Sequence, residues 1–437
     1  YRAKTEVVYL NKVPTSQYRA VGHPIGNSVG EALVDRAAEA CGIDPLEMRR
    51  RNIMEDDSYP RFSAAGIKLQ DMSHQRCLEA LSNKMNYSAL RHEQEECRKQ
   101  GLERGIGIAA FIKGTAPGPA GYYGAGGAPI ASQDACTVKL EPSGGIICMV
   151  GVTDQGQGVD TVMAQIAATA IGVPFEHVRV IEGDTDAVPY GGGTYASRAT
   201  AIGGEATYQA SLRLRSEILS IAGALLQAQP ETLDIVDGNV VDKESNAHRI
   251  SLEEIGRIGH FQVAELPNQI QPILSATHRF RLRDELYIFT NGIQGAYVEV
   301  DIDTGFIKLL KHWVVEDCGR VISPQLADEQ VRGGCIQGIG GALYEECVYD
   351  ERAQLQNGTL ADYLTPMSSE MPDIEVAHVQ TPTTVSELGA KGVGESGTSA
   401  APAVVMNAVN DALRPYNTYV TNQPITPKTV LMALGKV

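Results

Sequence analysis

The sequence predicts an α+β fold in which strands and helices alternate without an internal repeat. Short apolar runs typical of strands and longer segments with helical spacing follow one another along the chain. Several glycine-rich turns lead directly into the helical segments, so loops that end at helix N-termini are expected. At about 150 residues per domain, a length of 437 residues corresponds to two or three domains.

The first 104 residues (1–104) are expected to form an α-rich segment. Within residues 27–41, four apolar side chains recur every four positions and share one helix face: Val29, Leu33, Ala37 and Cys41. Gly42 ends this helix, and DPLE at 44–47 starts another with a capping residue followed by proline. We interpret both helices as scaffold. Residues 71–104 are highly charged and predict a solvated helix with a connecting loop.

Residues 105–275 are assigned to an α/β subdomain that carries two glycine-rich loops. Strands are predicted at 106–112, 135–141 and 145–152, and a turn at 142–144 joins the last two. The GQG sequence at 156–158 then precedes a helix that ends at Gly172. A second glycine-rich turn, from 183 to 206, leads into a long helix that reaches about residue 226.

Residues 276–437 are assigned to a second α/β subdomain. Strands are predicted at 286–289, 295–302 and 307–315, and an Asp-Thr-Gly turn at 303–305 joins the last two. A helix is expected from Pro324 to about residue 346. Near the C-terminus, KGVGES at 391–396 leads into residues with helical spacing.

The net charge of −16 argues against two classes of partner. Neither nucleic acid nor an anionic membrane surface attracts an acidic protein without a basic cluster, and the sequence contains none. No apolar run reaches the roughly 18 residues of a membrane helix, and no signal-peptide pattern opens the chain. We therefore expect a soluble, cytoplasmic protein. Because Tyr1 opens a stretch that already resembles mid-domain strand, we expect the chain to continue from an upstream half.

Eight cysteines are present, but their spacing is not that of a metal site. No CxxC pair occurs, so buried or idle thiols are the expected state. No protein ligand to a metal is predicted. Any iron–sulfur cluster that serves this protein is expected on another chain.

A GxGxxG pattern at 392–397 raises the question of a dinucleotide site. Such a loop follows a buried parallel strand, whereas the preceding QTPTTVSELGAK is polar. Glu395 would also place a carboxylate where a diphosphate has to bind. Glycines on both sides of Glu395 instead allow close approach by a bulky ligand and present a single carboxylate, as expected of a general base.

Four groups of motifs occur in a fixed order along the chain. They are GVTDQGQGVDT at 151–161, GDT at 183–185 with GTYASR at 193–198, VVEDCGRVISP at 314–324 with GGCIQGIGGALYEE at 333–346, and KGVGES. In this order, and together with residues 18–52, they resemble the molybdenum-binding large subunits of the xanthine dehydrogenase and aldehyde oxidase family. The resemblance implies the C-terminal, molybdenum-cofactor-binding portion of a molybdenum hydroxylase large subunit, with mixed sheets and packed helices.

The resemblance also implies a set of site residues. In the family the GQG and GTYASR loops hold a pyranopterin, and the matching residues here are Gln155, Gly156, Gln157, Gly158, Thr161, Thr194, Tyr195, Ala196, Ser197 and Arg198. Arg19 and Gly394 match further positions on the cofactor side, and Glu395 matches the catalytic base. Gln157 as a helix cap and Arg198 as a surface ion pair are the alternatives. Tyr18, Tyr122 and Tyr123 are candidates to stack on an aromatic substrate, with ordinary packing as their alternative.

The reaction that the resemblance implies is hydroxylation of an N-heterocyclic aromatic compound or an aldehyde, with water as the oxygen source. Glu395 would act as the base, and hydride would pass to molybdenum held by molybdopterin cytosine dinucleotide. Electrons would then leave through [2Fe-2S] and FAD on partner subunits. The upstream half of the large subunit would be a further partner.

Three alternatives remain open from the sequence. Ser396-Gly397-Thr398 after the glutamate is closer to bacterial members that include carbon monoxide dehydrogenases, so Mo–Cu chemistry is one. The second is a non-catalytic half-subunit that only completes a partner's cofactor site. The third is a nicotinamide-dependent dehydrogenase that uses the GxGxxG pattern.

Overall fold

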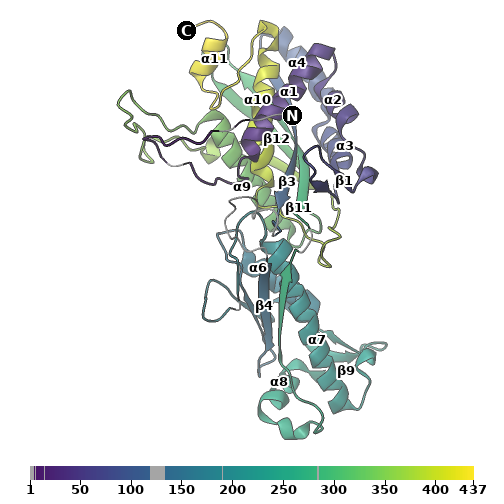
Figure 1. The fold of residues 1–437 in the computed structure, drawn as a ribbon. Helices are drawn as coiled ribbons and strands as arrows, with labels where there is room; N and C mark the ends of the chain where they lie inside the picture. The colour runs from purple at the N-terminus through teal and green to yellow at the C-terminus, as the bar shows by residue number, and fades with distance from the viewer. Residues whose placement is uncertain (1–3, 5, 14, 119–132, 189, 283–284) are drawn as a thin grey trace.

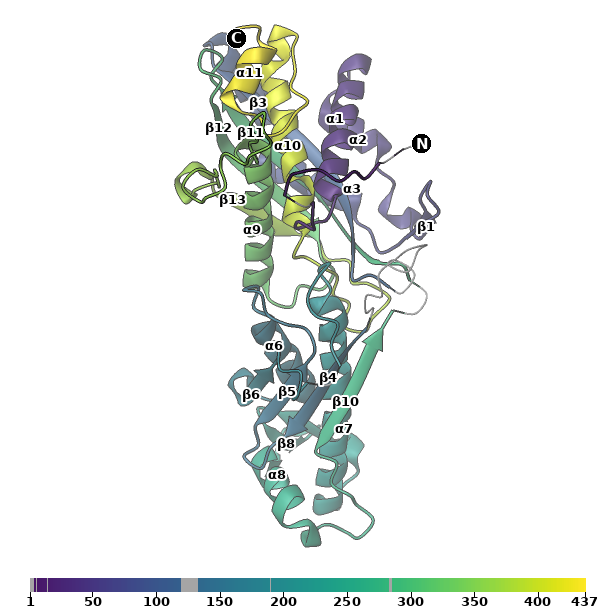
Figure 2. The ribbon, with the colours of Figure 1, turned by 60° about the vertical axis from the view of Figure 1, so that its left-hand side comes forward.

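Two lobes stacked end to end make up the molecule (Figures 1 and 2). The structure is a computed structural model, and it describes residues 4, 6–13, 15–118, 133–188, 190–282 and 285–437. The terminal lobe contains residues 15–118 and 285–437, and the middle lobe contains residues 133–282. Both lobes combine helices with mixed sheets, which confirms the predicted α+β class.

The terminal lobe is built on a four-stranded sheet with helices on both faces. Its strand order is β13 (Ile374–His378), β12 (Ile307–Asp317), β11 (Ile288–Val300) and β3 (Glu103–Thr115), and only β12 and β13 run parallel. On one face Ile106 and Ile108 pack with α3 (His74–Met85) and α4 (Tyr87–Lys99). On the other face Ala109 and Phe111 pack with α9 (Pro324–Leu343) and α10 (Ser396–Leu413). Each face therefore has its own apolar core.

The middle lobe has a second mixed sheet, with the order β10 (Ser275–Arg281), β4 (Gln133–Leu140), β5 (Ile146–Val150) and β6 (Val178–Ile181). Helices α6 (Val159–Ile171) and α7 (Glu205–Leu226) pack on it in one continuous core. A π-helical turn, Ala199–Gly204, precedes α7. At the far end lie α8 (Leu252–Phe261) and a small sheet of β7 (Leu233–Val236), β8 (Asn239–Asp242) and β9 (His248–Ser251) (Figure 1).

Helix α10 lies unusually close to β3 and α9, and glycines make this approach feasible. A Cβ on Gly107 would lie 2.0 Å from the carbonyl oxygen of Val404, and one on Gly105 would lie 1.9 Å from that of Ala408. A Cβ on Gly397 would lie 2.2 Å from the carbonyl oxygen of Val331 in α9. Since none of these atoms can be accommodated, the glycines set the position of α10 and of Glu395 at its N-cap.

Most predicted elements are present, but one prediction about the N-terminal segment is wrong. Residues 71–104 were expected to be a solvated helix, yet α3 buries Cys77, Leu78 and Leu81 against the sheet. The helix predicted at 27–41 exists as α1 (His23–Cys41) and ends at Gly42, followed by α2 (Pro45–Asn52). However, its predicted apolar face is turned outward, with Val29 60% and Leu33 64% exposed. The scaffold contacts of α1 are made by other residues, such as Ser28 and Ala38.

The two strands predicted at 286–289 and 295–302 form one strand, β11. The intervening residues pair on both sides, with β12 and with β3, so that the polar Asn291 and Gln294 are fully buried. Strand β3 belongs to the terminal lobe, and β10 pairs with β4 in the middle lobe. The division into segments 1–104, 105–275 and 276–437 stays a prediction, and the sheets do not follow its borders.

Six of the eight cysteines are buried, and all eight are free thiols, as the sequence predicted for most of them. Within the described part of the chain, no helix combines the length and the apolar character needed to cross a membrane.

The contact between β3 and α10 predicts opposite effects for two glycine-to-alanine changes. Gly107→Ala should lower the free energy of unfolding by at least about 1–3 kcal/mol, because the new methyl group meets backbone atoms of α10. Gly341→Ala, in α9, meets no atom within 4 Å and should be neutral or stabilise by up to about 1 kcal/mol. Urea unfolding of both variants measures the difference. Equal stability of the two variants would contradict the close approach.

Candidate active site

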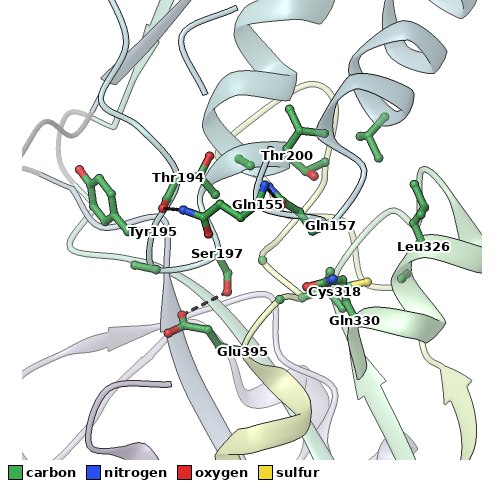
Figure 3. A pocket seen from close by; sticks show the side chains of 18 of the residues that line it. Gln155, Gln157, Thr194, Tyr195, Ser197, Thr200, Cys318, Leu326, Gln330 and Glu395 are labelled. Carbon is green, nitrogen blue, oxygen red and sulfur yellow. Dashed lines mark hydrogen bonds between the residues drawn. The ribbon is translucent and has the colours of Figure 1, made fainter. Parts of the chain in front are cut away.

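A large cavity lies between the two lobes and collects most of the residues predicted as a site (Figure 3). Its volume is about 1230 Å³. The walls come from residues 17–21, the loops at 155–157 and 190–197, the start of α9 with the loop before it, and the loop at 391–395. Ten predicted residues line it: Arg19, Gln155, Gly156, Gln157, Thr194, Tyr195, Ala196, Ser197, Gly394 and Glu395. Gly158, Thr161 and Arg198 do not.

The GQG loop is held by its own side chains. The carboxylate of Asp154 accepts from the backbone N–H groups of Gly156 (2.8 Å) and Gly158 (3.2 Å). The side-chain amide of Gln157 accepts from the N–H of Gln155 (2.5 Å) and donates to the carbonyl of Thr153 (3.1 Å). The N–H groups of Gln155, Gly156 and Gly158 are therefore occupied by acceptors from the loop itself. Gln157 makes no cap on α6, so that alternative is wrong.

The GTYASR loop joins the GQG loop to the catalytic candidate. Thr194 donates its hydroxyl to the carbonyl of Thr153 (2.7 Å) and accepts from that residue's N–H (2.9 Å). Gln155 donates to the carbonyl of Thr194 (3.0 Å), which ties the two loops together (Figure 3). Ser197 donates its hydroxyl to Glu395 at 3.1 Å. The GTYASR loop thus contacts the GQG loop through Thr194 and the terminal lobe through Ser197.

Arg198 is a structural residue rather than a surface ion pair. Its side chain is fully buried and pairs with the equally buried carboxylate of Asp134 at 2.9 Å. It also donates to the carbonyls of Gly193 (2.5 Å) and Gln133 (2.6 Å). The guanidinium therefore fixes the GTYASR loop to β4 on the side away from the cavity. The cavity wall is formed by the preceding residues of the loop, Thr194 to Ser197.

Among the described residues that line the cavity, Glu395 is the one with an acidic side chain, and it is only 8% exposed. Its Oε1 accepts from the backbone N–H of Ala20 at 2.8 Å. Its Oε2 accepts from Ser197 and lies 3.1 Å from the ammonium group of Lys113. An ionised carboxylate offers about four acceptor positions, so these three donors orient it and leave one position open.

Arg19 ties the Glu395 loop to α9. Its guanidinium donates to the carbonyl of Gly394, to Gln337 Oε1 (3.1 Å) and to both oxygens of Gln330 (2.9 and 3.1 Å). Gly392 lies against the GTYASR loop so tightly that a Cβ would come within 2.6 Å of Ser197 and Thr115. The backbone of the KGVGES loop is therefore positioned from three sides.

No strand leads into the GxGxxG pattern, so the hypothesis of a dinucleotide-binding loop at 392–397 lacks the strand that it requires. Residues 379–395 contain only turns and one isolated bridge, between Ala390 and Gly319. Lys391 beside it is fully buried and pairs with Asp317 at 3.3 Å. The glycines of this pattern serve close packing and not a strand-to-helix turn.

Sequence reasoning missed several residues of the site. Cys318, Arg320 and Lys391 line the cavity and stand inside motifs that were used only for the resemblance. Lys113 belongs to no motif, and its one signal is a charge directly after the apolar run at 105–112 of β3. Tyr18 lines the cavity as a candidate for stacking, whereas Tyr122 and Tyr123 lie outside the described residues.

A charged network lies behind Cys318. Among the described residues, ligand-type atoms of Glu316, Cys318 and His378 lie within 4.8 Å of one another. His378 contacts Glu316 through Nδ1 (2.5 Å) and Asp328 through Nε2 (2.8 Å). Burial lowers the pKa of His378, but the two carboxylates outweigh burial and raise it from 6.5 to about 9. Burial, followed by Glu316, raises the pKa of the Cys318 thiol well above its usual range. The His378 imidazolium therefore supplies a positive charge between the carboxylates of Glu316 and Asp328.

Comparison with known proteins places this geometry in a family. A family model of the molybdopterin cofactor-binding domain matches residues 80–372, and a second model of the same description matches residues 1–53. The chain is 34% identical to the nicotine 6-hydroxylase large subunit of Paenarthrobacter nicotinovorans over 428 residues, which are 98% of this chain and 52% of that protein. It is 30% identical to the carbon monoxide dehydrogenase large chain of Hydrogenophaga pseudoflava (89% of this chain, 48% of that one). It is also 30% identical to the xanthine dehydrogenase molybdenum-binding subunit of Escherichia coli (98% and 54%).

A solved structure shows the same fold. Quinoline 2-oxidoreductase from Pseudomonas putida 86 matches with a TM-score of 0.89 and 34% identity, over 96% of this chain and 53% of that chain. The chain thus spans about half the length of the relatives it matches. The matches confirm the resemblance read from the motifs, and they support a molybdopterin cofactor.

The His378 network predicts a stability that depends on pH. Because the pKa of His378 is raised in the folded state, its contribution is fully present below about pH 6.5 and is lost as pH rises through about 9. The contribution is at most about 3 kcal/mol, at 1.36 kcal/mol per unit of pKa. Urea unfolding between pH 6 and pH 10 should show this loss in the unsubstituted protein and a flatter profile in His378→Gln. Parallel profiles would contradict the network.

Proposed function

This chain belongs to the molybdopterin cofactor-binding family, and on that premise we propose that it is the cofactor-binding half of the catalytic large subunit of a molybdenum hydroxylase. One observation carries the proposal. The carboxylate of Glu395 is oriented by three donors at the wall of a cavity that is built from the GQG and GTYASR loops. A non-catalytic half-subunit would not need a carboxylate held in this way.

The cavity fits a molybdopterin cofactor in size and in lining. Its volume of about 1230 Å³ exceeds the roughly 300–1,000 Å³ of small-ligand sites, so a large cofactor and a substrate have room together. The side chains of Gln155, Gln157 and Thr194 keep hydrogen-bonding capacity beyond the bonds that join the two loops, and they would use it to hold the pterin. Arg320 is exposed in the cavity and would face a phosphate, which suits the cytosine dinucleotide form.

When bound, the cofactor would supply two-electron oxidation of the substrate together with transfer of oxygen from water. The chain itself supplies the proton acceptor. The Glu395 carboxylate would take a proton at its remaining acceptor position, while Ala20 and Ser197 keep both oxygens in place. Arg19 holds the loop that carries it, because its guanidinium connects Gly394 to Gln330 and Gln337 of α9.

An aromatic N-heterocycle is the favoured substrate class. Relatives named for nicotine and quinoline share 34% identity with this chain, and Tyr18, Tyr190 and Tyr195 lie at the cavity as aromatic surface. The relative named for carbon monoxide keeps Mo–Cu chemistry as the second candidate. Oxidation of carbon monoxide by a complex that contains copper would favour that candidate, and hydroxylation of quinoline without copper would favour the first.

The proposed partners are the remaining half of the large subunit and chains that carry [2Fe-2S] and FAD. The chain spans about half of its relatives, and the outward face of α1 offers a docking surface for the remaining half. This α1 face consists of Ile25, Val29 and Leu33, which are 60–74% exposed. Exposed apolar side chains that share one helix face in this way indicate an interaction site.

Replacing the proposed base should slow turnover and leave the cofactor in place. Glu395→Gln keeps the size of the side chain but removes the proton acceptor, so turnover should fall by about 10²- to 10⁴-fold at full molybdenum loading. Glu346→Gln, a change of an exposed glutamate outside the cavity, is the matched control. Both variants are to be assayed with quinoline and nicotine in the purified complex, together with metal analysis. Near-normal turnover of the Glu395 variant would refute the assignment.

Introducing negative charges on the α1 face should prevent this chain from binding the proposed remaining half of the large subunit. Expressed alone, the chain should self-associate or lack cofactor, because the α1 face is uncovered. Val29→Asp with Leu33→Asp should reduce self-association of the isolated chain and prevent its recovery in a molybdenum-containing complex from the source cells. Val236→Asp, at an exposed position of the middle lobe, is the control and should change neither. Light scattering and metal analysis distinguish the outcomes.

A further inference from the structure

A buried lysine contacts the Glu395 carboxylate. Lys113 stands near the end of β3, its side chain is 4% exposed, and its Nζ lies 3.1 Å from Glu395 Oε2. The same ammonium group donates to the carbonyl of Gly114 at 2.9 Å. Because an ammonium group in such a site has lost its water, these two oxygens determine where it lies.

The charges around Glu395 come from three elements. Lys113 approaches from β3, Arg19 from the N-terminal segment, and His23 from the first turn of α1. Burial and then the charge of Lys113 lower the pKa of His23, which favours its neutral form. Arg19 binds the Gly394 carbonyl rather than the carboxylate. Within the described part of the chain, Lys113 is thus the one cation in ion-pair contact with Glu395.

We propose that Lys113 is a positioning residue that keeps Glu395 ionised and oriented toward the cavity. This inference rests on the proposed function of Glu395 as the base. A carboxylate that is only 8% exposed would otherwise favour its protonated form, which cannot accept a proton. The ammonium group offsets this cost of burial through its 3.1 Å contact with Oε2.

The first test measures the carboxylate itself and requires no turnover. Infrared difference spectra between the unsubstituted protein and Glu395→Gln isolate the carboxylate band of Glu395, whose pH titration can then be followed. Lys113→Met, which keeps the length of the side chain, should move the midpoint of this titration to higher pH by about one to three pH units. Lys113→Arg keeps the charge and should leave the midpoint within about half a pH unit of that of the unsubstituted protein, well inside the shift expected for Met. An unmoved midpoint in a folded Met variant would overturn the proposal.

The second test is the pH dependence of turnover in the molybdenum-loaded complex. Lys113→Met should move the acidic limb of the profile by the same one to three pH units. A uniform loss at every pH would indicate a purely structural role and would overturn the proposal. If the infrared midpoint moves but the loaded complex hydroxylates neither quinoline nor nicotine, the ion-pair inference stands and the proposed function fails. Thermal unfolding of each variant establishes that it is folded.

Discussion

The structure depends on the close contact of helix α10 with β3 and α9. Glycines at positions 105, 107 and 397 let the backbones approach to distances that no Cβ could accommodate. Because interiors are close-packed, such a contact leaves the helix little freedom to slide or rotate. The N-terminus of α10 is therefore fixed relative to the sheet. Glu395, the N-cap of α10, lies at the cavity between the lobes, where the loops of the middle lobe form the opposite wall.

Three buried ion pairs lie around the cavity, and they have two different roles: two fix loop conformations, and one contacts the proposed base. Arg198 with Asp134 and Lys391 with Asp317 are sealed from solvent, and they pin the GTYASR and KGVGES loops from behind. Such pairs contribute little net stability, but removal of one partner is strongly destabilising, so they specify loop conformation. Lys113 with Glu395 is the pair at the cavity wall, where the carboxylate keeps an acceptor position for chemistry.

The division of labour between the lobes follows from this arrangement. The middle lobe contributes loops rich in amide and hydroxyl groups, and the terminal lobe contributes the charged groups Arg19, Arg320, Lys391 and Glu395. A ligand between the lobes would contact both sets at once. The outward apolar face of α1 lies on the terminal lobe, which also carries Arg19.

The amino-acid sequence by itself determined the fold class and most helix and strand positions, because periodicity and capping patterns are local properties of the chain. Ten residues that line the cavity were predicted from the resemblance of the ordered motifs to a known family. Only the tertiary structure decided which side of each element is used. The four-residue stripe of α1 has the spacing of a buried face, yet it points outward. Arg198 stands beside cavity residues, yet it turns to Asp134, 64 residues away. Lys113 and Glu395 are far apart in the sequence, and neither position carries a signal for the other. Their contact exists because α10 packs on β3, and packing between distant segments depends on the shape of whole surfaces, which no local pattern encodes.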